Sequence, residues 1–183
     1  MSIEILLKVS PEDHLEGNKI YQLERRLLEL LFPIVRSAAG ACIIKREGEK
    51  IYILLGKRKH EPYKEKLSFP LGRKLPEEDV YLTLPREVEE ETGLSLAIYS
   101  GLPNNKNKLF IHGFGPSYIL LDKETGYLIA VEVYEVYPYY KPNFKGHGDL
   151  AELKFYEISE TRREKLAPVT EAVLKDLGLL VQS

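Results

Sequence analysis

The sequence predicts an α/β protein in which helices flank a mixed β-sheet and an additional helix precedes the main domain. Residues 13–36 and 170–180 repeat apolar side chains at helical spacing. The chain between them holds several short apolar runs separated by polar, glycine-containing turns, a pattern typical of strands. Strands enclosed by amphipathic helices indicate layers in which the helices cover the faces of the sheet.

The composition is that of a folded globular domain. The chain has 183 residues, of which 44% are apolar and 30% are charged, enough for one domain with a sizeable core. The net charge is −2 with acidic and basic residues interspersed, which argues against general nucleic-acid binding and membrane binding. No apolar run approaches ~18 residues and no signal sequence is visible, so we expect a soluble, cytoplasmic protein.

Cys42 is the only cysteine of the chain. A single thiol excludes an intrachain disulfide and any cysteine-based zinc cluster. It lies in the apolar run of residues 41–44, so we predict a small buried hydrophobe rather than a nucleophile.

The predicted elements follow one another without an internal repeat. Residues 13–36 form the N-terminal helix, which Pro33 should end or bend. We therefore divide the chain into a helical extension, residues 1–36, packed on a main domain, residues 37–183. Within the main domain we expect a hairpin over residues 40–56, strands over residues 94–99, 117–122, 127–137 and 150–158, and a helix over residues 170–180.

An acidic stretch over residues 72–94 holds seven carboxylates and three basic side chains. On a helix, at ~100° per residue, Glu87, Glu90 and Glu91 fall within one narrow arc. Like charges at these spacings destabilise a bare helix by a few tenths of a kcal/mol per pair. A divalent cation reverses that effect, because hard cations such as Mg²⁺ prefer oxygen ligands. Gly93 is placed to end the helix.

The same stretch resembles the Nudix box, G-x5-E-x7-R-E-U-x-E-E-x-G-U with U aliphatic, at every defined position. The matching residues are Gly72, Glu78, Arg86, Glu87, Val88, Glu90, Glu91, Gly93 and Leu94. An acidic helix without a function needs none of this spacing, so the resemblance is specific.

The resemblance implies an α/β/α sandwich and a metal-dependent hydrolase. Nudix proteins cleave the pyrophosphate bond of a nucleoside diphosphate linked to another moiety, with Mg²⁺ or Mn²⁺. By resemblance, Glu87, Glu90 and Glu91 are the metal ligands, one of them also a candidate base, and Arg86 holds the box together by pairing with Glu78. Two alternatives are a nucleotide-sensing module without catalysis and an isoprenoid-type isomerase. Both would ordinarily show an altered box, and this box is intact.

Three positions around the box carry further expectations. Glu152 lies in a segment similar to one in which the family often has another acidic residue, and we choose it as auxiliary ligand or base. The alternative is an outward residue on an alternating strand. Leu71 stands where the family commonly has glycine, which lends its carbonyl to the metal; leucine keeps the carbonyl but restricts the backbone. Pro85 should either kink the helix or open it.

The substrate is less well defined by the sequence. Residues 53–72 partly resemble the coenzyme A pyrophosphatase branch, so coenzyme A is the leading substrate, followed by ADP-ribose and other nucleoside diphosphate derivatives. We expect Arg58 to bind substrate phosphates, which favour arginine donors. Tyr139 and its aromatic neighbours could stack an adenine, or instead fill the core or a dimer interface. A homodimer is also expected from the resemblance.

Overall fold

The computed structural model describes residues 2–15, 26, 30, 36–78, 80–97, 108–138, 144, 148–161 and 165–180. In this part of the chain the elements are β1 (Ile3–Val9), α1 (Pro11–Leu15), β2 (Ser37–Glu47), β3 (Lys50–Arg58), β4 (Leu67–Ser68), β5 (Leu71–Arg73), α3 (Val80–Thr92), β6 (Ser95–Ala97), β7 (Lys108–Asp122), β8 (Tyr127–Val136), β9 (Leu150–Glu157), η1 (Ile158–Glu160) and α4 (Pro168–Asp176).

The strands form a mixed sheet in the order β1–β7–β8–β2–β3–β4. Strand β5 pairs with β2, β6 with β7, and β9 with β3. Strands β2 and β8 are parallel, as are β6 and β7, whereas the other pairs are antiparallel. Strand β2 therefore lies at the centre of the sheet, next to β8, β3 and β5.

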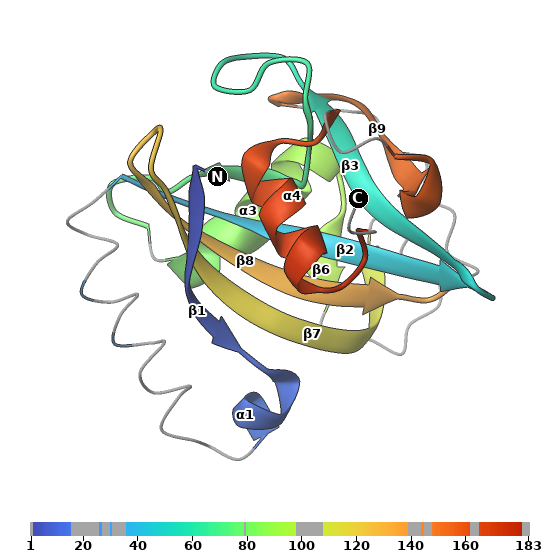
Figure 1. The fold of residues 1–183 in the computed structure, drawn as a ribbon. Helices are drawn as coiled ribbons and strands as arrows, with labels where there is room; N and C mark the ends of the chain where they lie inside the picture. Colours follow the sequence, from blue (N-terminus) through green and yellow to red (C-terminus); the bar gives the residue numbers. More distant parts are fainter. Residues whose placement is uncertain are drawn as a thin grey trace.

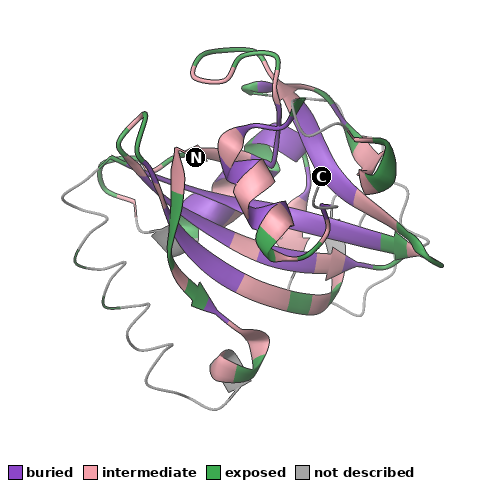
Figure 2. Cartoon of the chain, in the orientation of Figure 1, coloured by how far each residue is buried: buried purple, intermediate pink, exposed green. Residues whose placement is uncertain are grey.

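The two faces of the sheet carry separate cores. The odd-numbered residues 39, 41 and 43 of β2 pack with Leu84 and Val88 of α3. The even-numbered residues 38, 42 and 44 pack with Val173 and Leu174 of α4. This alternation is that of a strand buried on both sides. Helices α3 and α4 accordingly lie on opposite faces (Figure 1), and most of β2 is buried (Figure 2). The predicted α/β/α sandwich is confirmed.

Most of the predicted strands are confirmed with shifted ends. The hairpin over residues 40–56 is β2 and β3, joined by a turn in which Gly48 has a φ of 61°. The strands predicted over residues 117–122 and 127–137 belong to β7 and β8. The C-terminal helix starts at Pro168, two residues earlier than predicted, because proline suits the first turn of a helix. Cys42 is fully buried, as predicted.

The N-terminal segment differs from the prediction. Ile3–Val9 form β1, an edge strand that pairs antiparallel with β7, rather than part of a helical extension. Lys8 of this strand makes an ion pair of 2.6 Å with Asp176, which also accepts a hydrogen bond from Tyr118. The helix predicted over residues 13–36 lies almost entirely outside the described residues. The division of the chain at residue 36 stays a prediction.

Helix α3 distinguishes between the two roles expected for Pro85. It begins at Val80, so Pro85 lies inside the helix and does not open it. Pro85 has no N–H for the carbonyl of residue 81, and the helix continues beyond it to Thr92. Among the described residues, no helix has both the length and the apolar character needed to cross a membrane.

Replacing Leu174 by alanine tests the core beneath α4. Leu174 is fully buried, so Leu174→Ala should lower the free energy of unfolding by about 2–5 kcal/mol, measured by urea denaturation. Leu82→Ala is the matched control, because Leu82 is 62% exposed on α3 and its truncation should change stability by less than about 0.5 kcal/mol. Equal losses in the two variants would contradict this description of the core.

Candidate active site

The three glutamates singled out by the sequence line one pocket. Glu87, Glu90 and Glu91 project from α3 into a cavity of about 530 Å³ that also contacts β5 and the loop after β3. Glu87 and Glu91 are buried, with 8% and 3% of their surface exposed, whereas the side chain of Glu90 is 57% exposed. Two carboxylates are thus held away from water and a third lies at the mouth of the pocket.

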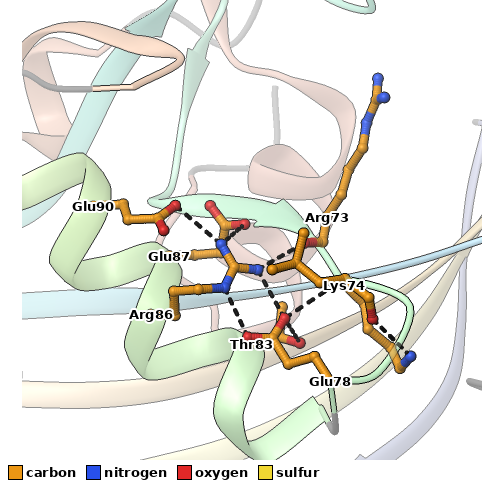
Figure 3. Close-up of polar contacts among 8 residues, drawn as sticks. Arg73, Lys74, Glu78, Thr83, Arg86, Glu87 and Glu90 are labelled. Carbon is orange, nitrogen blue, oxygen red and sulfur yellow. Dashed lines mark hydrogen bonds and ion pairs between the residues drawn. The ribbon is translucent and has the colours of Figure 1, made fainter.

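Arg86 ties this acidic cluster together (Figure 3). Its Nε and Nη2 donate to the two carboxylate oxygens of Glu78 over 2.7 and 2.8 Å. Its Nη1 donates to Glu87 at 2.7 Å and to Glu90 at 3.0 Å. Nη2 also donates to the carbonyl of Arg73 in β5 at 2.9 Å. The predicted pairing of Arg86 with Glu78 is confirmed, and the same guanidinium joins α3 to β5.

Glu78 is held in its charged form by this network. The hydrogen bonds from Arg86 are the largest influence and lower the pKa of Glu78 to about 2. The hydroxyl of Thr83 and the backbone N–H of Leu75 donate to the same carboxylate, at 2.8 and 3.2 Å. The loop before α3 is therefore fixed to the helix by the Glu78 carboxylate, whose two oxygens accept hydrogen bonds from Arg86, Thr83 and Leu75.

Gly72 leaves room for the Glu87 carboxylate where β5 approaches α3. A Cβ atom at this position would lie 1.9 Å from Oε2 of Glu87, closer than any non-bonded contact allows. The backbone φ of Gly72 is not left-handed, so the requirement is for space rather than for conformational freedom. The first residue of the box thus sets the position of the Glu87 carboxylate.

The backbone of Leu71 also faces the pocket. Hydrogen bonds of 3.0 Å join Ala41 N–H to the Pro70 carbonyl and Lys74 N–H to the Ser37 carbonyl. In an antiparallel pair such bonds alternate, so the intervening Leu71 directs its N–H and carbonyl away from β2. Its N–H donates to Oε2 of Glu91 at 2.8 Å. The φ of Leu71 is not left-handed, so leucine in place of glycine causes no strain here.

The pocket holds more negative charge than its protein partners offset. Burial is the main cause that raises the pKa of Glu91, to about 8, and burial also raises the pKa of Glu87. The charges of Glu87 and Asp149 raise the pKa of Glu91 further. Carboxylates that are buried together in this way favour their charged form only when positive charge is added, which a divalent cation supplies.

The donor set therefore fits a hard cation such as Mg²⁺ or Mn²⁺. Within the described ranges, no three acidic or histidine side chains already surround a common point. Instead, Arg86 spans Glu87 and Glu90, and Glu91 turns toward Leu71.

The two residues predicted to bind the substrate are Arg58 and Tyr139. Arg58, at the end of β3, lines the same pocket, and its Nε donates to the carbonyl of Pro62 at 2.8 Å. Tyr139 lies outside the described residues. Of its aromatic neighbours, Phe144 packs against Phe155 with ring centroids 5.8 Å apart, beside the core under α3. Phe144 therefore fills core space rather than forming an open stacking surface.

Glu152 does not join the three glutamates. Its side chain is 65% exposed, does not line the pocket, and lies 3.9 Å from Nζ of Lys57. A bulge in the pairing of β3 with β9 and a φ of 50° at Glu152 accompany this outward direction. Asp149, three residues earlier, lines the pocket and acts electrostatically on Glu91. The sequence signal for Asp149 is its place in the same segment as Glu152, where Asp149, Glu152 and Phe155 follow one another at three-residue spacing.

A family model for the NUDIX domain matches residues 35–177, most of the chain. The protein thus belongs to the class of α/β/α hydrolases whose box supplies the acidic helix, and the chain is a member of the Nudix family. It is a Nudix pyrophosphohydrolase.

Solved structures share the fold at low sequence identity. An Ap4A hydrolase from C. elegans is 18% identical, with a TM-score of 0.54 over 79% of this chain and 96% of that one. A bifunctional NMN adenylyltransferase/ADP ribose pyrophosphatase from Francisella tularensis is 17% identical, with a TM-score of 0.60 over 89% of this chain and 46% of that one. The NUDIX domain of Shewanella oneidensis NrtR, complexed with ADP ribose, is 13% identical, with a TM-score of 0.56 over 85% and 96% of the two chains. No curated protein sequence matches the chain.

The Arg86–Glu78 pair should make the stability of the protein depend on pH. Because the folded-state pKa of Glu78 is about 2, below its ordinary value of 4.5, the pair stabilises the fold above pH 4.5 and loses its contribution as pH falls toward 2. At pH 7, Glu78→Gln should cost about 2 kcal/mol in the free energy of unfolding. Chemical denaturation at several pH values should show the difference from wild type narrowing below pH 4.5.

The matched control for this prediction is Glu89→Gln, an exposed glutamate on the same helix. Its stability difference from wild type should be small at every pH. A constant cost of Glu78→Gln from pH 7 to pH 3 would show that the carboxylate charge contributes nothing.

Proposed function

We propose that this protein uses Mg²⁺ or Mn²⁺ to hydrolyse the pyrophosphate bond of a nucleoside diphosphate linked to another moiety. The observation that carries the proposal is one pocket lined by Glu87, Glu90, Glu91 and Asp149, with two of these carboxylates buried. Arg58 lines the same pocket and can donate to a substrate phosphate. Membership of the Nudix family supports the reaction class.

The proposed metal ligands are the carboxylates of Glu87, Glu90 and Glu91 and the carbonyl of Leu71. A bound divalent ion neutralises the diphosphate charge and lowers the pKa of a ligated water. Arg86 acts as a positioning residue, since it donates to Glu87 and Glu90 and to the backbone of β5. The direction of the Leu71 carbonyl, away from β2, supports its inclusion in this set.

The auxiliary acid outside the box is proposed to be Asp149. It lines the pocket, whereas Glu152, the sequence-based choice, lies near Lys57. The loop that holds Asp149 lies against α3, since a Cβ at Gly148 would be in ordinary contact with Cγ of Glu91, at 3.5 Å. A carboxylate there can accept the proton of an attacking water. A contribution of Glu152 stays a prediction.

The substrate class extends from ADP-ribose to coenzyme A. The S. oneidensis structure binds ADP ribose and the F. tularensis protein is named an ADP ribose pyrophosphatase, which supports ADP-ribose as the first compound to test. Coenzyme A rests on the partial sequence resemblance alone. We also propose that the protein is cytoplasmic and forms a homodimer.

A substrate screen tests the reaction class. Wild-type protein should release phosphate-containing products from at least one of ADP-ribose, coenzyme A, NADH, Ap4A and the nucleoside triphosphates when Mg²⁺ or Mn²⁺ is present. Addition of EDTA should remove the activity, because the carboxylates alone repel the anionic diphosphate. No turnover of any compound with either metal would contradict the proposal.

Removing one carboxylate charge tests the site. Glu90→Gln and Glu91→Gln should each lower kcat/KM by about 100-fold or more, the loss expected for a residue that binds the metal or accepts the proton. Both variants should stay folded, because Glu91→Gln keeps a side-chain oxygen for the N–H of Leu71 and Glu90 is exposed. Glu89→Gln, on the same helix, should keep full activity. Full activity in both site variants would exclude this mechanism.

A smaller substitution tests the position of Glu87. The added methyl of Gly72→Ala must displace the Glu87 carboxylate, so kcat/KM should fall by about 10–100-fold and the Mg²⁺ needed for half-maximal activity should rise. Gly113→Ala is the control, because a Cβ there meets its nearest neighbour, Glu135, at an ordinary 3.6 Å. Wild-type kinetics in Gly72→Ala would show that this approach does not set the site.

A further inference from the structure

The pocket continues from the glutamates to the other face of the sheet. Side chains alternate along β5, and Gly72 faces Glu87 on the α3 side. The side chains of Leu71 and Arg73 therefore point to the α4 side, where Leu71 packs against the core under α4. Both residues line the pocket, together with Ile129 of that second core. The cavity thus passes the free edge of β5 and forms a second arm over the α4 face.

Three neighbouring strands build the floor of this second arm. Arg73 of β5 is paired with Ala38 of β2, and Ala38 is paired with Ile129 of β8. Tyr127 lies two residues before Ile129 and so on the same face of β8. The guanidinium carbon of Arg73 lies 5.8 Å from the centroid of the Tyr127 ring. The floor is therefore apolar at Ala38 and Ile129, with one aromatic ring and one guanidinium at its edge.

A tethered loop forms the opposite wall. Pro62 and Tyr63, in the loop between β3 and β4, line the pocket. The Tyr63 backbone has a left-handed φ of 66°, and its hydroxyl donates to Oδ2 of Asp122 at 2.9 Å. Asp122 is 2% exposed and also accepts the backbone N–H of Glu124 at 3.0 Å. Asp122 thus holds the loop wall in place, and both of its carboxylate oxygens already accept hydrogen bonds from the protein.

Arg73 is available to a ligand. Figure 3 shows its side chain extending away from the Arg86 cluster, although its backbone carbonyl belongs to that cluster. In the described part of the chain, no ion pair joins Arg73 to a carboxylate. A planar guanidinium beside a tyrosine ring can pack on, or donate to, an aromatic heterocycle.

We infer that this second arm, over Ala38, Tyr127 and Ile129 with Arg73 at its edge, binds the nucleobase of the substrate. The inference rests on the proposed function, because the glutamate end of the same pocket then receives the diphosphate. A nucleobase is flat and largely uncharged, and its faces stack on aromatic side chains and guanidinium planes. Tyr127 and Arg73 are specificity-determining residues that act on binding rather than on the hydrolytic step.

Equilibrium binding without any divalent metal tests the inference. Calorimetric titration of the full chain with AMP, GMP, CMP, UMP and ribose 5-phosphate compares ligands that share a phosphate and a sugar. At least one nucleotide should bind about tenfold more tightly than ribose 5-phosphate, the gain expected from one stacked base. Tyr127→Leu should remove most of this difference, and Arg73→Gln should reduce it several-fold. Neither variant should change the affinity for ribose 5-phosphate.

Two matched controls lie away from the pocket. Tyr156→Leu removes another tyrosine that packs against the core under α4, and Arg46→Gln removes an exposed arginine of β2 paired with Glu135. Both should bind the chosen nucleotide as wild type does. Arg73 is exposed, so its replacement keeps the test valid if Tyr127→Leu proves unstable.

The outcomes separate this inference from the proposed function. The base-binding arm would be overturned, even in an active hydrolase, if no nucleotide bound more tightly than ribose 5-phosphate. It would also be overturned if Arg73→Gln and folded Tyr127→Leu both kept the wild-type affinity for the nucleotide. An equal loss for ribose 5-phosphate would overturn it as well. Base-dependent binding that depends on Tyr127 or Arg73 supports the inference, whether or not the protein hydrolyses the compounds of the screen.

Discussion

The site depends on one guanidinium that offsets part of the charge of a crowded set of carboxylates. Arg86 donates to Glu78, Glu87 and Glu90 and to the carbonyl of Arg73. Without it, the acidic side chains along α3 and its preceding loop would repel one another at close range. Because the same group also bonds to β5, the helix and the strand that form the pocket are fixed by a single, largely buried side chain.

Strand β5 determines the shape of the pocket around that cluster. It has only three residues and pairs with β2 along one edge, and the backbone groups of its other edge face the pocket. The Leu71 N–H reaches Glu91 from this free edge, and Gly72 leaves room for Glu87. Alternation along the strand sends Arg73 to the opposite face of the sheet. One short strand therefore links the acidic end of the pocket to its apolar arm.

Several parts of the fold and the site could be predicted from local sequence. The spacing of Glu87, Glu90 and Glu91 along a helix, and the pairing of Arg86 with Glu78, depend on residues close in sequence. Whether Asp149 or Glu152 faces the pocket depends on a bulge and a backbone conformation that no residue pattern indicates. The strand formed by Ile3–Val9 was missed because its pairing partner, β7, lies more than 100 residues away.

The sequence by itself determined the layered α/β class, the acidic helix and the glycine that ends it, because helical spacing and turn residues act over a few positions. Only the tertiary structure decided which carboxylates share a pocket and that Arg73 lies beside Tyr127. These two residues are brought together through the pairing of β5, β2 and β8. Strand register is a long-range property, set by how both faces of the sheet are buried at once.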